Sequence, residues 1–402
     1  MDQILSCFPF CSSILSHRIE EMKLTLGLLT IFFVYHKTID SLNPWWRLLI
    51  LPIIWLVLTY RKQIDAGIDQ VIQYKKSLLI IKIVFFMLLA FRGGKSIYNT
   101  YRPLKAIEDI AVVHKQAVEI LFQKKENPYK HILFEQVPII IEKDGKKDTY
   151  SGFIYTPLGM IYYAPFILWL GKKGMYAGNL IGYWGLFILS LLILSKKSSF
   201  HTYLGGSLFL AVDYIFTKAF NRGTNDFLPA LLMLLSIFYL SRNKNKLSGI
   251  FLGLSLGFKQ YPGAIISFIF LHNKKIITLS VASIVFAICI LPFAINDFTS
   301  LYRQIFEVFL LAPMGNTILK DLPSHLTWPI PLFAVLGMSY LSYKRRLAND
   351  WSSYLIPFLL FIIFTKSSFT TYFICIFPIS IFFFLGIPER GNISDSEEKQ
   401  LV

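Results

Sequence analysis

The sequence alternates long apolar runs with short polar segments. Met175–Leu194, Ile276–Pro292 and Trp351–Phe364 contain no charged residue. Because a helix needs roughly 20 mostly apolar residues to cross the hydrocarbon core of a bilayer, these runs predict an all-α polytopic membrane protein with about twelve spans. The predicted spans are 23–40, 45–60, 76–92, 154–171, 175–194, 202–217, 225–241, 247–271, 276–295, 327–342, 352–367 and 370–387.

Composition and charge support this interpretation. Of the 402 residues, 54% are hydrophobic and only 16% are charged, which is less charge than a soluble domain carries. The net charge of +16 comes from short basic clusters between apolar runs, such as Arg61-Lys62, Lys274-Lys275 and Lys344-Arg345-Arg346. Basic loops of this kind are typical of the cytoplasmic face of a membrane. The predicted partner is therefore membrane lipid and not nucleic acid.

Assigning the basic segments to the cytoplasm divides the chain into four parts. They are an N-terminal cytoplasmic segment with an extra pair of spans (1–77), a membrane module with a long outer loop at 93–153 (78–295), C-terminal spans with an outer loop at 297–327 (296–387), and a cytoplasmic tail (388–402).

Two basic segments disagree with this threading. Lys196-Lys197 and Arg242–Lys246 fall on the outer face, although both resemble cytoplasmic loops. A re-entrant or broken helix between residues 175 and 246 would restore the agreement.

The long first outer loop contains signals for regular structure. Asp109–Gln123 has the period of an amphipathic helix that lies on the membrane surface, and Asn127-Pro128-Tyr129 ends it. Pro138–Glu142 and Lys147–Phe153 are β-prone and flank the turn signal Asp144-Gly145, which predicts a small hairpin. The apolar face of the helix consists of Ile110, Val113, Ala117, Ile120 and Leu121.

Ionisable residues in or near apolar runs are the first candidates for chemistry. Glu108 and Asp109 begin the amphipathic helix just above the bilayer, where a carboxylate can act in catalysis or simply cap the helix. Lys259 lies in an apolar run between Gly257 and Pro262. In a distorted helix it can meet a phosphate; the alternative is that its amine snorkels to the interface.

Two further polar sites remain open. The segment 221–226 carries more hydrogen-bonding groups than a turn requires, although a turn accepts all of them. Asp213 and Lys218 lie just upstream and can pair with each other. His325 shares the outer face with Asp297, and a solvated loop histidine is the alternative to a functional one.

Several familiar site types are absent from the sequence. There is no Walker-type phosphate loop, no His-Glu-x-x-His, no nucleophile elbow and no paired Cys-x-x-Cys. ATP-driven transport and zinc hydrolysis therefore have no sequence support, and nothing in the sequence requires a metal or another cofactor.

Three ordered stretches resemble the polytopic glycosyltransferases of the C-type fold, and in particular the bacterial polyprenol-phosphate-dependent mannosyl- and arabinosyltransferases (family 87-like). They are Glu108-Asp109 with the following helix and Asn127-Pro128-Tyr129; Phe153–Leu158; and Arg222–Asn225, followed by a basic loop and Ser248–Pro262. Thr224 stands where the family often has glutamine, and the C-terminal third shows no matching motif.

The resemblance implies a hexosyl- or pentosyltransferase in the bacterial cytoplasmic membrane, with its active site on the extracytoplasmic face. A polyprenyl-phosphate-linked sugar would be the donor, and a lipid or glycan would be the acceptor. Asp109, or its neighbour Glu108, would be the general base of a metal-independent inverting displacement. Lys259 and Arg222 would bind the donor phosphate. Substrate contacts would come from Asn225, Tyr155, Tyr129 and His325.

Two other functions use the same features. A transporter or flippase of a lipid-linked substrate would place Lys259 in a midplane binding site, but it should show inverted repeats, and the sequence has none that we detect. A polysaccharide polymerase or ligase would share the lipid donor and would place its key loop late in the chain, near Asp297–Thr327.

Overall fold

The computed structural model is mostly helical. It describes residues 75–101, 109–131, 133, 139–143, 146–150, 152–211, 223–270, 274–307, 314–315, 333, 336–337, 340, 367–368 and 373–385. The predicted spans 23–40, 45–60 and nearly all of 327–342 and 352–367 lie outside these residues. The number of about twelve spans therefore remains a prediction.

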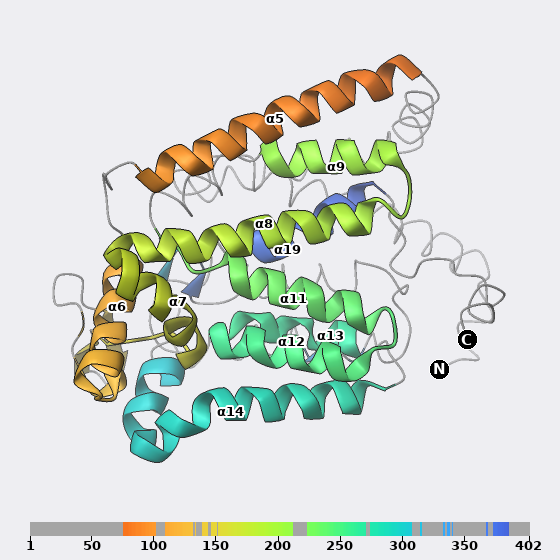
Figure 1. The fold of residues 1–402 in the computed structure, drawn as a ribbon. Coiled ribbons are helices and arrows are strands. Elements are labelled where there is room, and N and C mark those ends of the chain that lie inside the picture. The colour runs from red at the N-terminus through yellow and green to blue at the C-terminus, as the bar shows by residue number, and fades with distance from the viewer. Residues whose placement is uncertain are drawn as a thin grey trace, which may run out of the picture.

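The larger helices lie roughly side by side (Figure 1). They are α5 (Lys75–Tyr101), α8 (Gly174–Leu194), α9 (Ser199–Ala211), α11 (Phe227–Leu240), α12 (Asn245–Phe258), α14 (Lys275–Tyr302) and α19 (Phe373–Phe384). Three described segments are long and apolar enough to cross a membrane, namely Lys76–Asn99, Gly174–Leu194 and Lys275–Phe306. The shorter apolar helices α7 (Pro157–Leu170) and α11 accompany them.

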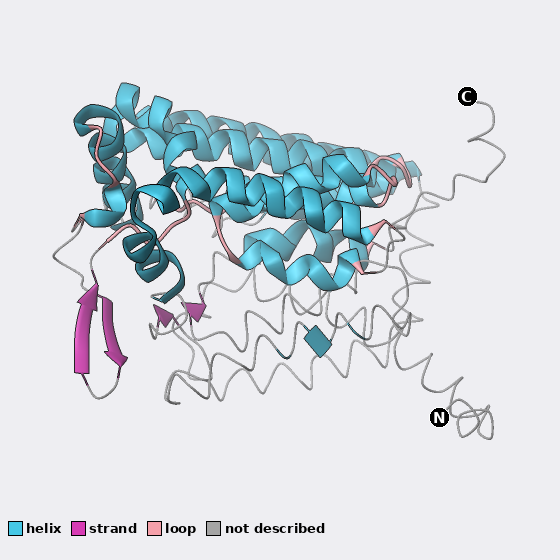
Figure 2. Cartoon of the chain, turned by 90° about the horizontal axis from the view of Figure 1, so that it is seen from below, coloured by secondary structure: helices cyan, strands magenta, loops and turns pink. Residues whose placement is uncertain are grey.

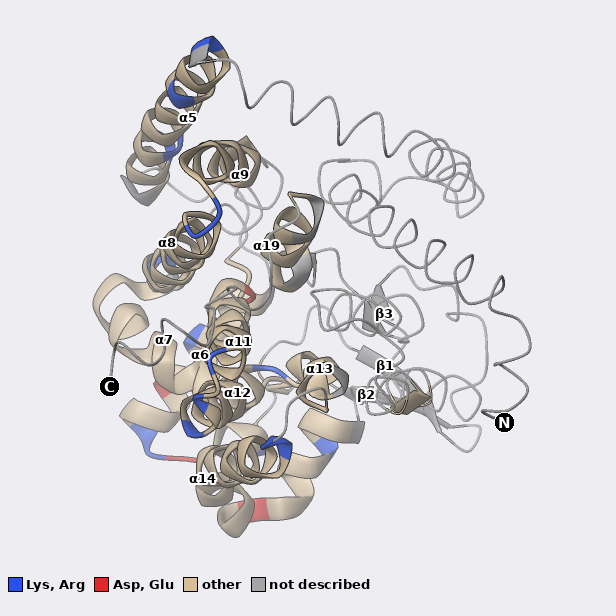
Figure 3. Ribbon diagram, turned by 90° about the vertical axis from the view of Figure 1, so that its right-hand side faces the viewer, with Lys and Arg blue, Asp and Glu red and all other residues tan. Residues whose placement is uncertain are grey.

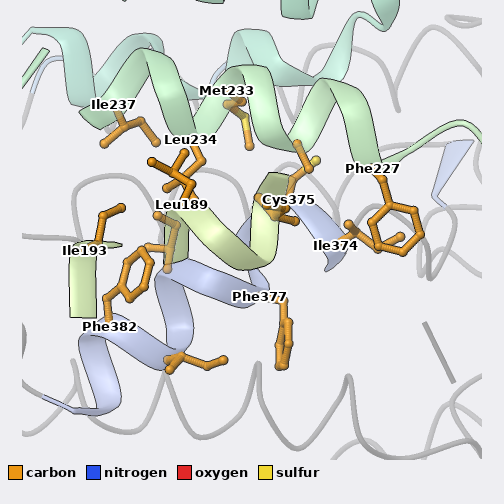
Figure 4. Packing of buried hydrophobic residues seen from close by; sticks show 14 of the residues in the cluster. Leu189, Ile193, Phe227, Met233, Leu234, Ile237, Ile374, Cys375, Phe377 and Phe382 are labelled. Atoms are coloured by element: carbon orange, nitrogen blue, oxygen red, sulfur yellow. The ribbon is translucent and has the colours of Figure 1, made fainter. Parts of the chain in front are cut away.

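The main core lies where α8, α11 and α19 meet. Leu189 and Ile193 of α8 face Leu234 of α11 and Phe382 of α19, and all four side chains are buried (Figure 4). On the other side of α11, helices α12 and α14 pack very closely. A Cβ atom at Gly253 would lie 2.6 Å from the carbonyl oxygen of Ala282, so only glycine permits this approach of the two backbones.

The bundle has two chemically different ends. We call the end that holds α6 (Asp109–Val118) the α6 end, and the opposite end the turn end, because the tight turns 195–198 and 241–244 lie there (Figure 1). These turns carry Lys196-Lys197 and Arg242, and α14 also begins at the turn end with Lys275 (Figure 3). Among the described residues, Asp and Glu occur only toward the α6 end.

Helix α7 is an irregular element that helps to bring the turns 195–198 and 241–244 to the same end, and it lies before residue 175. Helix α7 has 14 residues, so it is only ~21 Å long and shorter than the hydrocarbon core. Gly159 near its start faces His114 of α6, and the short helix η4 (Gly171–Lys173) after its end also packs against α6. The chain therefore enters and leaves α7 at the α6 end, one element before the region 175–246 in which the sequence suggests a break.

The segment predicted to form the first outer loop, 93–153, contains α6, its π-helical continuation η2 (Glu119–Lys124) and the single turn η3 (Pro128–Lys130). Strands β1 (Ile139–Lys143) and β2 (Lys146–Tyr150) pair antiparallel in the segment where the sequence predicts a hairpin, and Figure 2 shows them beside the helices at the α6 end. The turn residues 144–145 lie outside the described residues.

The apolar face of α6 is covered by protein. Ala117 and Val118 are fully buried and Ile120 is 7% exposed, because α6 packs against α7. The sequence predicted a helix with this face on the membrane surface. The helix is present, but its apolar residues contribute to a second core at the α6 end.

Candidate functional site

The start of α11 lies against the first turn of α6. Gly223 has φ +66°, a left-handed conformation that glycine adopts without strain. A Cβ atom at this position would lie 3.0 Å from the Cβ of Ala111. Glycine therefore allows the two segments to touch, and it places the next three residues, Thr224, Asn225 and Asp226, inside the protein at 1%, 0% and 0% exposure.

Lys259 reaches the same place from the end of α12. The helix ends at Phe258, Lys259 is extended, and Pro262 is the second residue of the 3-10 helix η5 (Tyr261–Ile265). This break agrees with the glycine and proline pattern of the sequence. Lys259 is 6% exposed, so the alternative that its amine snorkels to the interface is wrong.

The amine of Lys259 forms a buried ion pair. Its Nζ lies 2.5 Å from Oδ1 of Asp226, and the hydroxyl of Tyr261 donates to the same oxygen over 3.0 Å. The ammonium also lies 5.6 Å from the ring centre of Tyr155 and 5.5 Å from that of Tyr261. Asp226 precedes the first residue of α11, where the helix dipole favours a carboxylate. The pair is therefore stabilised by charge, hydrogen bonding and aromatic faces together.

His114 of α6 holds Asn225. The carbonyl oxygen of Ile110 accepts from Nδ1 of His114 over 2.8 Å, so Nε2 is the acceptor for the Asn225 amide, 3.3 Å away. The imidazole is fully buried and contacts the rings of Tyr155 and Tyr163. Its partners are thus those of a neutral histidine in one tautomer.

A second bond network fixes the backbone beside it. The hydroxyl of Tyr163 donates to Oδ1 of Asn179 over 2.7 Å, and the Asn179 amide donates to the carbonyl oxygen of Thr224. Tyr163 and Asn179 are both fully buried. Helices α7 and α8 therefore position the polar segment from one side while α6 and α12 position it from the other.

The burial of His114 predicts a pH dependence of stability. Burial lowers its pKa to about 3, and the positive charge of Lys259 adds to this effect, while the bond to Ile110 opposes it. Since the unfolded chain takes up the proton near pH 6.5 and the folded protein does not, this contribution is complete above pH 6.5 and declines as the pH falls toward 3. We expect the free energy of unfolding to be lower at pH 5 than at pH 7.5.

The measurement compares unfolding at the two pH values in wild type, His114→Gln and His131→Gln. His131 is a half-exposed histidine that follows η3 in the same segment between the spans. The difference between the two pH values should shrink in His114→Gln and persist in His131→Gln. An equal difference in all three proteins would contradict the assignment.

The structure places the other predicted site residues as follows. Asp109 is the first residue of α6, two positions before the Ala111 that touches Gly223. Tyr155 lies between Lys259 and His114. Glu108, Arg222 and His325 lie outside the described residues, as do Asp213 and Lys218.

Tyr129 has a supporting position. Its ring is 1% exposed and packs against Phe153 and Phe293, while its hydroxyl donates to the carbonyl oxygen of Tyr155 over 2.6 Å. It thus fixes the backbone of Tyr155 from within the core. The preceding Asn127 docks on α14 through the side chain of Asn296, at 3.1 Å.

Asp226 and His114 were missed as individual candidates. The sequence did single out the segment that ends at Asp226, but it offered Asp213 and Lys218 as the pair. A usable signal existed. Asp226 and Lys259 stand at equal distances from the turn 241–244, so two antiparallel helices joined by that turn bring them together. His114 gave no signal, because a histidine in an amphipathic helix normally faces water.

Comparison with known proteins supplies the chemistry class. Residues 153–343 match the family model of glycosyltransferase family 87. The match begins at Phe153 in the second core and contains the polar segment 223–226 and Lys259. Neither the curated proteins nor the solved structures give a match. The part of the chain that holds the buried ion pair is thus similar to glycosyltransferase family 87, and this similarity supports a glycosyltransferase activity.

Proposed function

We propose that the protein transfers a hexosyl or pentosyl group from a polyprenyl-phosphate-linked donor to a lipid or glycan acceptor. Asp109 takes the proton of the acceptor hydroxyl as its oxygen attacks the anomeric carbon, and the lipid phosphate leaves from the opposite side with inversion of configuration. The observation that carries the proposal is the contact of Ala111 with Gly223. It brings the first turn of α6, which Asp109 begins, to the buried polar segment of the family-matched region.

The leaving phosphate needs a cation, because negative charge develops on it in the transition state. Lys259 and Arg222 are the two candidates in this region. The charge of Lys259 is already paired with the carboxylate of Asp226. Arg222 directly precedes Gly223, which contacts α6. We therefore favour Arg222 over Lys259 as the residue that binds the donor phosphate. Asn225, Tyr155 and His325 remain proposed substrate contacts, and Tyr129 supports Tyr155.

The charge of the two ends supports an extracytoplasmic active site. At the turn end, the described Asp, Glu, Lys and Arg residues are all Lys or Arg, which is the pattern of a cytoplasmic face. We therefore place the turn end in the cytoplasm and the α6 end outside a bacterial cytoplasmic membrane.

This orientation predicts the labelling of two matched cysteine variants. Lys124 in the outer loop and Lys244 in the turn before α12 are both exposed lysines. In a background with Cys7, Cys11, Cys289 and Cys375 changed to alanine, an impermeant maleimide should label Lys124→Cys in intact cells. It should label Lys244→Cys only after permeabilisation. The opposite pattern would invert the orientation and contradict an outer active site.

Sugar transfer by the purified protein in liposomes tests the proposed function. Radiolabelled polyprenyl-phosphate hexoses and pentoses are supplied with extracts of membrane lipids and glycans as acceptors. We expect transfer from at least one donor, with inversion at the anomeric carbon. Movement of intact labelled donor across the bilayer without transfer would instead support a flippase.

A further inference from the structure

Three consecutive residues at the start of α11 each have a buried oxygen without a hydrogen-bond partner among the described residues. They are Oγ1 of Thr224, Oδ1 of Asn225 and Oδ2 of Asp226, and their residues are at most 1% exposed. Buried polar atoms are nearly always paired, and leaving one unpaired costs about 1–3 kcal/mol. Three adjacent orphans at the family-matched site indicate groups that a ligand satisfies.

The other polar atoms of the same side chains are already used. The Asn225 amide donates to His114, and Oδ1 of Asp226 accepts from Lys259 and Tyr261. The two atoms that remain on Asn225 and Asp226 are therefore acceptors, and the Thr224 hydroxyl can accept or donate. A ligand that fits must present donors, which a sugar hydroxyl does and an ionised phosphate does not.

The electrostatics agree with this choice. Lys259 and Asp226 together carry no net charge, and the unpartnered oxygen of the pair belongs to the carboxylate. An anionic phosphate placed there would face the negative charge of that oxygen and the acceptor oxygen of Asn225, neither of which can donate a hydrogen bond to it. The hydroxyl groups of a neutral polyol can donate to both of these oxygens and can pair with the Thr224 hydroxyl in either direction.

We infer that Thr224, Asn225 and Asp226 form the subsite for the hydroxyl groups of the transferred sugar, and that Lys259 orients Asp226 there without binding the donor phosphate. This inference rests on the proposed function, because it assumes a sugar-phosphate lipid as ligand. It assigns sugar specificity to the segment between Gly223 and α11.

The test measures binding of two probe types to the full-length protein in nanodiscs. One probe is farnesyl phosphate, which lacks a sugar, and the other is a panel of farnesyl-phosphate hexoses and pentoses. The variant is Thr224→Val, which removes only the unpartnered hydroxyl at nearly constant shape. The control is Ser236→Ala, which removes a buried hydroxyl of α11 that is bonded to Ser248, 3.1 Å away. Unfolding temperatures verify that both variants are folded.

We expect Thr224→Val to weaken the tightest sugar-bearing probe by roughly tenfold, the loss that about 1.4 kcal/mol represents, and to leave farnesyl phosphate unchanged. One version of that probe that lacks a single sugar hydroxyl should bind wild type about as weakly as the intact probe binds Thr224→Val. The affinity of this deoxygenated probe should not fall further in Thr224→Val. Ser236→Ala should change neither probe.

Equal weakening of both probe types by Thr224→Val would overturn the inference, because it would make the segment a phosphate site. Unchanged binding of every probe would overturn it as well. Failure of the proposed function appears separately, in wild type alone, as no preference for any sugar-bearing probe over farnesyl phosphate.

Discussion

Replacing Lys259 by methionine is expected to destabilise the protein by about 3–5 kcal/mol, because it leaves the carboxylate of Asp226 buried without its counter-ion. The pair is one of the most enclosed polar contacts of the described residues, with side-chain exposures of 8% for Lys259 and 0% for Asp226. The remaining hydrogen bond from Tyr261 does not neutralise the charge. Unfolding in mixed detergent micelles, followed by tryptophan fluorescence, measures the loss.

The double variant Lys259→Met with Asp226→Leu removes both charges and should be more stable than the single variant Lys259→Met. Lys246→Met is the matched control, since Lys246 is an exposed lysine in α12, the helix that Lys259 follows, and it should change stability by no more than about 0.5 kcal/mol. If Lys259→Met were as stable as Lys246→Met, the ion pair would not be a structural element of the site.

Replacing Asp109 by asparagine is expected to lower the rate of sugar transfer by about 100- to 10,000-fold, the usual contribution of a general base. Asparagine preserves the size of the side chain, so α6 should remain in place. The bond between His114 and Ile110 lies within α6 and does not involve the changed side chain. The measurement is single-turnover transfer at saturating donor, with the unfolding temperature as a check on folding.

Glu108→Gln is the control for this result, because it changes the neighbouring carboxylate by the same chemistry. It should lose far less activity than Asp109→Asn. Full activity in Asp109→Asn together with an inactive Glu108→Gln would exchange the roles of the two residues. Full activity in both variants would refute an outer-loop carboxylate as the base.

The apolar runs predicted the helices well where one run corresponds to one helix. The predicted span 175–194 differs from α8 by one residue, and the span 276–295 lies within α14. The run 154–171 gave the wrong topology, because an apolar composition does not reveal that both ends of α7 contact α6. Apolar side chains are equally compatible with lipid and with protein neighbours.

The candidate site was predictable in part. Lys259 stood out because a charge in an apolar run must find a partner. Its partner Asp226 is 33 positions away, and a single sequence shows such a contact only once the turn between α11 and α12 has been located. The burial of His114 depends on packing between α6 and α7, which periodicity alone cannot supply.

The most direct test of the central claim is photo-crosslinking of the full-length protein in nanodiscs with a polyprenyl-phosphate sugar that carries a diazirine on the sugar. Mass spectrometry locates the attached residues. Crosslinks are predicted in the segment from Gly223 to Phe227 or in the adjoining parts of α6 and η5, where the buried polar cluster lies. Crosslinks confined to the turns 195–198 and 241–244, at the other end of the bundle, would contradict the assignment of the site.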